Sequence, residues 1–254
     1  MKPKISTIIS YCSNDKDFID ECIEHALPFS QEISVCSSSH FFDGMLENFE
    51  EKLRFYKKYE GKINPISFPF DSTKHPGQLH NRMRAWGWKA LTKPVDWILF
   101  LDADEIVDTE KFITWINSVN LEVFTGYRFI GYWYFRDTCW QANSLENVSV
   151  LAKASKCSYE FLDNCLGERL GLLDSQSVSN VKDLNNQSMF HHYSWARTKE
   201  GMIRKAKSWG HHNDKDWLAL IEQEFKRDFN ETCIDFVHGY SFKKVEPFIN
   251  VRIT

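Results

Sequence analysis

Two carboxylates, Asp102 and Asp104, stand one residue apart directly after an apolar run, in the stretch WILFLDADEIV at 97–107. Carboxylates at this spacing can share a hard cation such as Mg²⁺ or Mn²⁺, which keeps coordination positions open for substrate phosphates. The simpler alternative is a strand end followed by an Asp that caps a helix, a common use of Asp. Because the preceding run is apolar enough to be a central strand, we expect the carboxylates at the mouth of a sheet.

The segments before this motif alternate between β-branched or apolar runs and helical patterns. Strands separated by helices predict a mainly parallel, doubly wound sheet, in which ligands bind beyond the carboxyl ends of the strands. Asp102 and Asp104 stand at such an end. The expected strands are 4–11, 32–39 and 64–70, and the expected helices are 14–27, 45–61 and 77–92.

The second half of the chain is richer in aromatic and β-branched residues and lacks long helices between its strands. This texture predicts antiparallel additions to the sheet at 127–138 and 148–155, and a final strand at 188–197. A basic helix is expected to follow from a Thr198 cap. The predicted fold class is therefore α/β, with a Rossmann-type sheet flanked by helices, an antiparallel addition and a C-terminal helical tail.

We expect one domain, because a single core commonly extends to about 250 residues and the chain has 254. Differences in its sequence pattern divide it into three parts, at 1–110, at 111–197 and in a helical tail at 198–254.

The stretch LFLDADE resembles the DxD motif of GT-A-fold glycosyltransferases, and the order of elements before it is similar to the family 2 type. The resemblance extends from about residue 4 to about residue 197, judged from the order of elements. It implies a GT-A fold and a nucleotide-diphosphate sugar as donor, with 1–110 as the nucleotide-sugar-binding half and 111–197 as the acceptor and catalytic half. It also implies that Asp102 and Asp104 hold Mn²⁺ or Mg²⁺ on the donor diphosphate, with Asp102 in the nucleotide site as well. The implied reaction is transfer of the sugar to a hydroxyl of a glycan or glycoconjugate, with inversion.

The nucleotide contacts of the family correspond to loops after the first two strands. Family 2 members often carry an Asp after the second strand, whereas this chain reads VCSSSHFFDG. Asp43 can replace that Asp, or Ser37 and Ser38 can contact the nucleotide through hydroxyls. In the first loop Tyr11 can stack on the base, although a tyrosine at a strand end is core at least as often.

Basic residues for the diphosphate are available in HNRMRAW, where Arg82 and Arg84 cannot both face the sheet. Arg197, just after the expected final strand, is a further candidate. The pair His191 and His192 must point to opposite faces of that strand. Many GT-A enzymes place a late His at the metal or diphosphate, so the resemblance assigns His192 as third metal ligand and His191 as the alternative; half-buried histidines at a strand edge are the other interpretation.

An inverting transfer needs a carboxylate that takes the proton of the acceptor hydroxyl. The family places this base downstream of the DxD motif, and here FLDNCLGERLGLLD at 161–174 is the acidic stretch in that interval. Glu168 is the first choice, with Asp163 and Asp174 as alternatives. An exposed ion pair between Glu168 and Arg169 is the competing interpretation, because such pairs are common on protein surfaces.

The composition of the chain indicates which binding partners and which cellular compartment to expect. A net charge of -4, from 31 basic and 35 acidic residues, argues against a nucleic-acid binder with a broad positive surface. Seven cysteines without a CxxC pair indicate free thiols in a reducing compartment. No stretch reaches the roughly 20 apolar residues of a membrane span and no signal peptide is evident, so we expect a cytoplasmic protein. The basic helix after Thr198 allows at most a weak peripheral contact with a membrane.

Two other functions fit the same residues. A nucleotidyltransferase or a nucleotide-sugar hydrolase could use paired Asp residues on a diphosphate. A carbohydrate-binding module without catalysis is the alternative from outside the enzymes, with a structural Asp cluster and aromatic residues that hold a glycan.

Overall fold

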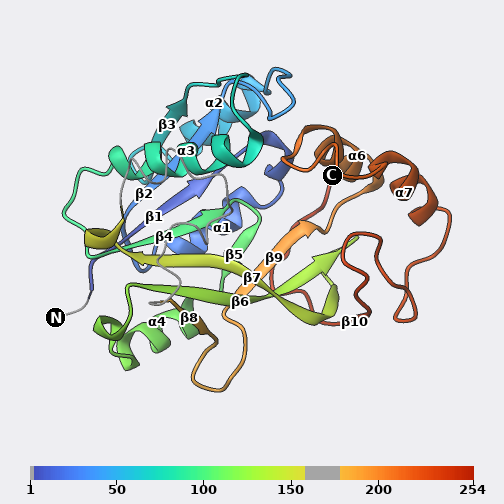
Figure 1. Cartoon of the computed structure of the whole chain (residues 1–254). Coiled ribbons are helices and arrows are strands. Elements are labelled where there is room, and N and C mark those ends of the chain that lie inside the picture. The colour runs from blue at the N-terminus through green and yellow to red at the C-terminus, as the bar shows by residue number, and fades with distance from the viewer. Residues whose placement is uncertain (1–2, 158–177) are drawn as a thin grey trace.

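The computed structural model describes residues 3–157 and 178–254. Its strands form one sheet in the order β3-β2-β1-β4-β7-β6-β9-β5, with β10 paired to β7 and β8 paired to β6 (Figure 1). The strand bounds are β1 Ile5–Ser10, β2 Ser30–Ser38, β3 Asn64–Phe68, β4 Trp97–Asp102, β5 Glu105–Val107, β6 Gly126–Phe135, β7 Trp140–Lys153, β8 Val178–Val181, β9 Phe190–Trp195 and β10 Phe242–Lys244.

Helices cover both faces of this sheet, as the α/β prediction requires. The α-helices are α1 Ile19–Ala26, α2 Phe49–Lys58, α3 Pro76–Lys89, α4 Thr109–Ser118, α6 Lys199–Ser208 and α7 Trp217–Glu224. Three short 3-10 helices complete the described elements: η1 Ser13–Asp15, η2 Leu121–Val123 and η3 Ala154–Lys156.

The first four strands of the sheet order are parallel, and β4 lies at their inner edge. β4 pairs with β1 in parallel and with β7 in antiparallel fashion. In this register Ser10 lies opposite Asp102, so β1 and β4 end at the same level. The predicted mainly parallel sheet with an antiparallel addition is confirmed, and the Asp102 carboxylate lies at the carboxyl end of a central strand.

The side chains of β4 alternate between two apolar clusters on opposite faces of the sheet, as the two-residue period of a strand dictates. Leu99 and Leu101 pack in one cluster with α1 and α4, whereas Ile98 and Phe100 pack in the other with α3. α3 approaches the sheet closely at Gly87, where a Cβ atom would lie 2.6 Å from both Cys36 Sγ and Ile8 Cγ2. Because real Cβ atoms do not approach so near, glycine is required at this point of the helix.

Three local predictions need correction. The second helix begins at Phe49 and not at residue 45, because the Asn48 side chain accepts the Glu51 N–H and caps it. The DxD motif leads into the short strand β5, and the Asp cap of the next helix is Asp108. β9 is not the last strand, because β10 returns from the tail to pair with β7.

The chain after β9 forms α6 and α7, which lie beyond the end of β9, and the C-terminus lies near α6 (Figure 1). Thr198 caps α6 by accepting the Gly201 N–H, as predicted. These helices close a third apolar cluster that includes Trp195, Trp217 and Phe242. Across residues 3–157 and 178–254, no helix combines the length and the apolar character that crossing a bilayer requires.

Candidate active site

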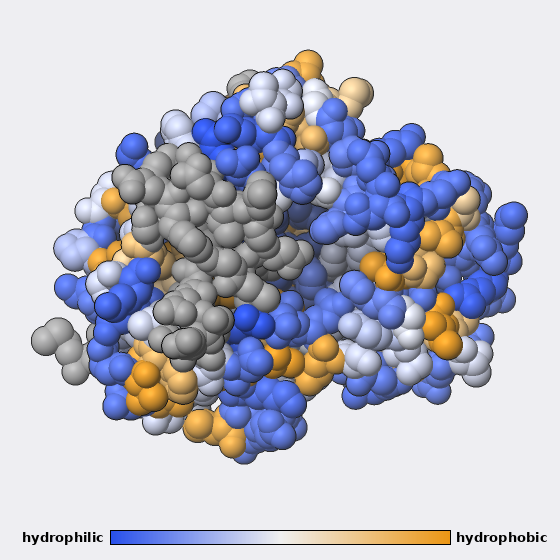
Figure 2. Space-filling model, viewed as in Figure 1, coloured by the Kyte–Doolittle hydropathy of each residue, from blue (hydrophilic) through white to orange (hydrophobic). Residues whose placement is uncertain are grey.

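The candidate site lies where β1 and β4 end and where α6 comes back over them. In Figure 2 the surface is hollowed beside the region of α6, and the residues on that side of the hollow are mainly hydrophilic. The carboxyl ends of parallel strands are the usual place for a ligand in such a sheet.

Asp102 is held by α3. Its Oδ1 accepts hydrogen bonds from Arg84 Nη2 at 2.9 Å and lies 3.1 Å from His80 Nε2. Arg84 is itself buried and donates a second bond to Asn81 Oδ1 at 2.9 Å. The Asp102 side chain is 21% exposed, so this carboxylate faces both the cation and the solvent.

Asp104 is more deeply buried and meets two permanent cations. Its Oδ2 accepts hydrogen bonds from Lys205 Nζ at 3.0 Å and Arg197 Nη2 at 3.1 Å. Its Oδ1 lies 3.6 Å from His192 Nε2, and the side chain is only 5% exposed. Burial alone would raise the pKa of Asp104, but the charges of Lys205, His192 and Arg197 hold it well below its usual range.

Arg197 ties this site to the loop after β1. It is 3% exposed and donates to Asp15 Oδ1 at 2.5 Å, to the Asn14 carbonyl and to the Ser194 carbonyl. Asn14 Nδ2 in turn donates to Ser208 Oγ of α6 at 2.7 Å. Because the loop after β1 is bonded both to Arg197 and to Ser208 of α6, the end of β1 and the start of the tail are held together.

These contacts define a group of side chains that we call the charged cluster. Its members are three carboxylates and three permanent cations, which form two sets of ion pairs: Asp102 with Arg84, and Asp15 and Asp104 with Arg197 and Lys205.

The two adjacent histidines lie in opposite surroundings. His192 lies between Asp104 and Glu146, whose Oε2 is 3.5 Å from Nδ1. Burial would lower the pKa of His192, but the carboxylates of Glu146 and Asp104 outweigh it and raise that pKa. His191 is buried on the other side beside Tyr134 and Phe248, and burial lowers its pKa to about 3.

Glu105 is completely buried, and its side chain bonds to the backbone of the motif. Its Oε2 accepts the Asp102 N–H at 3.0 Å and the Ser149 hydroxyl at 3.1 Å. It therefore fixes the turn between Asp102 and Asp104.

The described side chains do not fit a resident divalent metal in this arrangement. Within 3–157 and 178–254, no three or more His, Cys, Asp or Glu side chains are placed to hold a metal ion. The physical reason is that Asp104 faces cations and an imidazole through both oxygens, while Asp102 faces Arg84 and His80. The chain brings together Asp102, Asp104 and His192, as predicted, but it also brings their counter-charges.

The residues predicted to contact the nucleotide near the ends of β1 and β2 differ in their exposure and in their contacts. Tyr11 is 1% exposed and its ring packs on Phe55, so its ring lies in the core. The Ser37 hydroxyl shares a hydrogen bond of 2.6 Å with Tyr56. Asp43 is exposed and accepts the Met45 N–H at 2.9 Å.

The two arginines of α3 separate, as their spacing predicts. Arg84 joins the charged cluster, whereas Arg82 Nη1 lies 3.4 Å from Asp71 on the loop before the helix.

The three candidates for the catalytic base, Glu168, Asp163 and Asp174, lie outside the described residues.

Sequence reasoning did not single out Asp15, His80 and Glu146. Asp15 had a signal, because the loop after the first strand of a parallel sheet must emerge at the edge that carries Asp102. Glu146 had none: it lies within the long strand β7 and is placed 3.0 Å from His238 Nε2 by the return of the tail.

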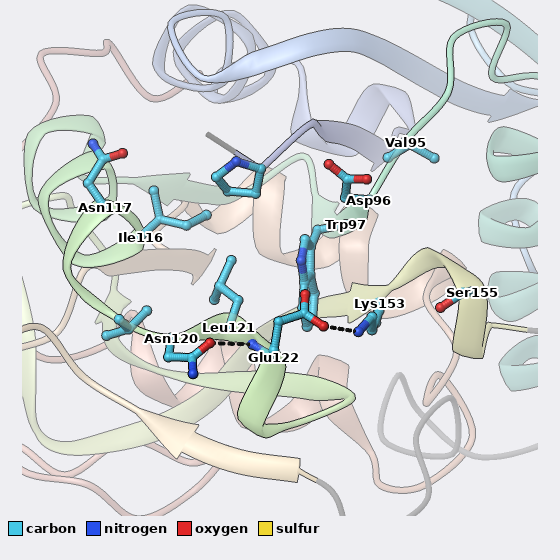
Figure 3. A pocket seen from close by; sticks show the side chains of 12 residues that line it. Val95, Asp96, Trp97, Ile116, Asn117, Asn120, Leu121, Glu122, Lys153 and Ser155 are labelled. Carbon is cyan, nitrogen blue, oxygen red and sulfur yellow. Dashed lines mark hydrogen bonds and ion pairs between the residues drawn. The ribbon is translucent and has the colours of Figure 1, made fainter. Parts of the chain in front are cut away.

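A separate cavity of about 740 Å³ lies at the opposite end of β4, where Trp97 begins the strand (Figure 3). Its lining includes an ion pair between Glu122 and Lys153, and the Asn120 side chain accepts the Glu122 N–H. None of the predicted site residues in the described part of the chain lines it. The cavity is thus distinct from the charged cluster.

Comparison with known proteins gives distant structural likenesses. No protein-family model and no curated protein matches the chain. A TarS fragment from S. aureus, crystallised with UDP-GlcNAc, is 12% identical, with a TM-score of 0.47 over 87% of this chain and 73% of that one. Galactosyltransferase LgtC is 12% identical, with a TM-score of 0.44 over 84% of this chain and 95% of that one.

A third likeness is to 4-diphosphocytidyl-2C-methyl-D-erythritol synthase from Anaerococcus prevotii. It is 14% identical, with a TM-score of 0.45 over 81% of this chain and 96% of that one. Identities this low leave the chemistry to be argued from the side chains of this chain.

Proposed function

We propose that this chain is a glycosyltransferase that moves a sugar from a nucleotide-diphosphate sugar to a hydroxyl of a glycan or glycoconjugate. The observation that carries the proposal is the convergence of Asp102 and Asp104 with Arg84, Arg197 and Lys205 at the carboxyl end of a central parallel strand. Buried cations held by carboxylates suit a diphosphate, because preformed donors stabilise charge that develops on a leaving group. The sugar component of the proposal rests on the resemblance of LFLDADE.

The donor would lie across the ends of β1, β2 and β4. We assign its nucleotide to the side of Ser37 and Asp43, with Tyr11 beneath as a core residue that shapes the floor. The diphosphate would lie toward Arg84 and Lys205. Arg82, paired with Asp71, lies at the rim and is the less direct candidate for the diphosphate.

The reaction needs a base for the acceptor hydroxyl. Glu168 stays the first candidate, followed by Asp163 and Asp174, by position after the DxD motif. In a transfer with inversion, the acceptor oxygen attacks the anomeric carbon from the side opposite the diphosphate, while the base takes the hydroxyl proton. Glu168→Gln is expected to abolish transfer and to retain nucleotide binding.

The test is a donor panel with product analysis. UDP-, GDP-, CDP- and dTDP-sugars are each incubated with the chain in Mn²⁺, in Mg²⁺ and in excess chelator, and the products are resolved by chromatography. Release of nucleoside diphosphate from one donor supports the proposal, and an added acceptor that takes up the sugar completes it. Release of pyrophosphate from a nucleoside triphosphate and a sugar phosphate would indicate nucleotidyl transfer instead, and no turnover of any donor would contradict an enzyme of this class.

A further inference from the structure

We propose that Lys205, positioned by Asp104 and Arg197, takes the place of a divalent metal at this site, so that a donor diphosphate binds without a metal ion. The inference rests on the proposed function and concerns the same site. It also explains why the DxD-like motif and a late histidine meet here without forming a metal-binding set.

The first observation is the occupation of Asp104 by cations. Lys205 Nζ and Arg197 Nη2 bind the same oxygen, Oδ2, at 3.0 and 3.1 Å. The other oxygen faces His192 at 3.6 Å, and the side chain is 5% exposed. A divalent ion on this carboxylate would lie within a few ångströms of two positive charges, and their repulsion would oppose binding.

The second observation is the charge balance of the charged cluster. Its three carboxylates, Asp15, Asp102 and Asp104, are matched by three permanent cations. A Mg²⁺ or Mn²⁺ site draws the ion to carboxylates whose charge the protein leaves uncompensated. Here Asp102 and Asp104, the carboxylates that the motif offers to an ion, are each paired with cations of the protein, so their attraction for a divalent cation is weak.

The third observation separates the roles of the two cations. Arg197 is 3% exposed and uses four of its five N–H groups on Asp15, Asn14, Ser194 and Asp104, so most of its hydrogen-bonding capacity holds the site. It is a positioning residue.

Lys205 is more accessible, with 12% of its side chain exposed. Among the described residues its ammonium donates to Asp104 and to Ser194 Oγ, at 3.0 and 2.8 Å. An ammonium has three N–H groups, so one remains for a phosphate oxygen. Lysine commonly binds phosphate as a compact point charge.

The proposed step balances without a metal. The acceptor oxygen bonds to the anomeric carbon as the bond from that carbon to the diphosphate oxygen breaks. The electron pair of the broken bond stays on the nucleoside diphosphate, and the charge that develops there is met by Lys205. The proton of the acceptor hydroxyl passes to the carboxylate base.

The first experiment measures metal binding without any substrate. Free Mn²⁺ is counted by electron paramagnetic resonance during a titration of the wild-type chain and of Asp104→Asn. We expect no stoichiometric binding by either protein at micromolar metal. A stoichiometric site in the wild type that Asp104→Asn removes would overturn the inference.

The second experiment measures diphosphate binding in chelator by calorimetry with UDP, GDP, CDP and ADP. We expect one or more of them to bind the wild type, and Lys205→Gln to weaken that binding by about tenfold or more, since a charged hydrogen bond is lost. Lys207→Gln is the matched control, because Lys207 lies exposed on the same helix, and its affinity is expected to equal that of the wild type. Lys205→Arg keeps the charge and is expected to retain part of the affinity, which protects the test if Lys205→Gln is poorly folded.

The outcomes distinguish this inference from the proposed function. Binding that appears only when Mn²⁺ or Mg²⁺ is added, or equal affinities of Lys205→Gln and the wild type, would overturn the inference and leave glycosyl transfer standing. Absence of binding by every nucleotide, with and without metal, would overturn both.

Discussion

The two sides of β9 place neighbouring residues of the same type in opposite environments. His191 stacks on the Phe248 ring at a centroid distance of 3.9 Å and shares a hydrogen bond of 2.7 Å with the Tyr134 hydroxyl. His192 lies between the carboxylates of Asp104 and Glu146. Burial lowers the pKa of the first histidine, and neighbouring charges raise the pKa of the second. The charge state of a side chain here follows from its contacts and not from its residue type.

On the His192 side of β9, the largest expected effect on stability comes from removing the negative charge of Asp104. Asp104→Asn leaves Arg197 and Lys205 buried without the carboxylate that both contact. Breaking a buried ion pair from one side commonly costs about 3 kcal/mol or more, and we expect the free energy of unfolding at pH 7 to fall by that amount. Urea unfolding measures it, with Asp214→Asn as control because Asp214 is 58% exposed. Equal stabilities of the two variants would contradict the description of Asp104 as the organising charge.

The apolar side of β9 predicts an acid-sensitive stability. His191 has a pKa of about 3 in the folded chain, against about 6.5 when unfolded, so between these pH values the unfolded chain binds more protons. Stability therefore falls as the pH drops below about 6.5, by about 3 kcal/mol at pH 4.5 from this group alone. His191→Leu should lose less stability than the wild type between pH 7 and pH 4.5 in urea unfolding. His211→Gln, which changes an exposed histidine, should follow the wild type; identical losses in all three proteins would refute a buried neutral His191.

The Phe248 ring stacks on His191. Removing this ring tests whether the apolar contacts of His191 account for the difference in pKa between the two histidines. Phe248 is half-buried, so Phe248→Ala should lower the free energy of unfolding by about 2 kcal/mol, less than for a fully buried ring. Water that reaches His191 should also raise its pKa toward about 6.5, which NMR titration of the ring protons detects. Val123→Ala, at a position that is 63% exposed, is the control and should change neither quantity. An unchanged pKa in Phe248→Ala would show that other groups keep the ring dry.

The smallest effect is expected for an ion pair at the surface. Lys199 and Glu222 lie 2.8 Å apart on α6 and α7, with side chains 33% and 53% exposed. Glu222→Gln should change the free energy of unfolding by less than about 0.5 kcal/mol, because water and salt screen an exposed pair. A loss comparable to that of Asp104→Asn would remove the distinction between buried and exposed pairs that the first prediction assumes.

Much of the parallel half of the fold was predictable, because local patterns carry it. The apolar run before Asp102 predicted a buried strand, and the alternation of strands with helices predicted a mainly parallel sheet. The Thr198 cap was also readable, since its hydroxyl bonds a backbone N–H three residues away. The start of α2 was not predicted, because the apolar spacing extends to residue 45. The helix instead begins after Asn48, whose side chain caps it by accepting the Glu51 N–H.

The candidate site divides in the same way. Strand ends and strand alternation predicted that Asp102, Asp104 and one of the two histidines would lie at one edge, and the resemblance selected His192. Their partners were harder to find. The sequence pattern around Lys205 predicts a basic helix face exposed to solvent. Only the packing of α6 against η1 brings Lys205 to Asp104.

The sequence by itself determined the α/β class, the position of the acidic pair at a strand end and the opposite orientation of the two histidines, because these depend on contacts between residues near in the chain. Tertiary structure alone decided what the carboxylates face. Lys205 lies 101 residues from Asp104 along the chain, and Arg197 lies 182 residues from Asp15. Such distant pairings depend on how the tail docks, and it is this docking that surrounds a motif typical of metal sites with the cations of the protein itself.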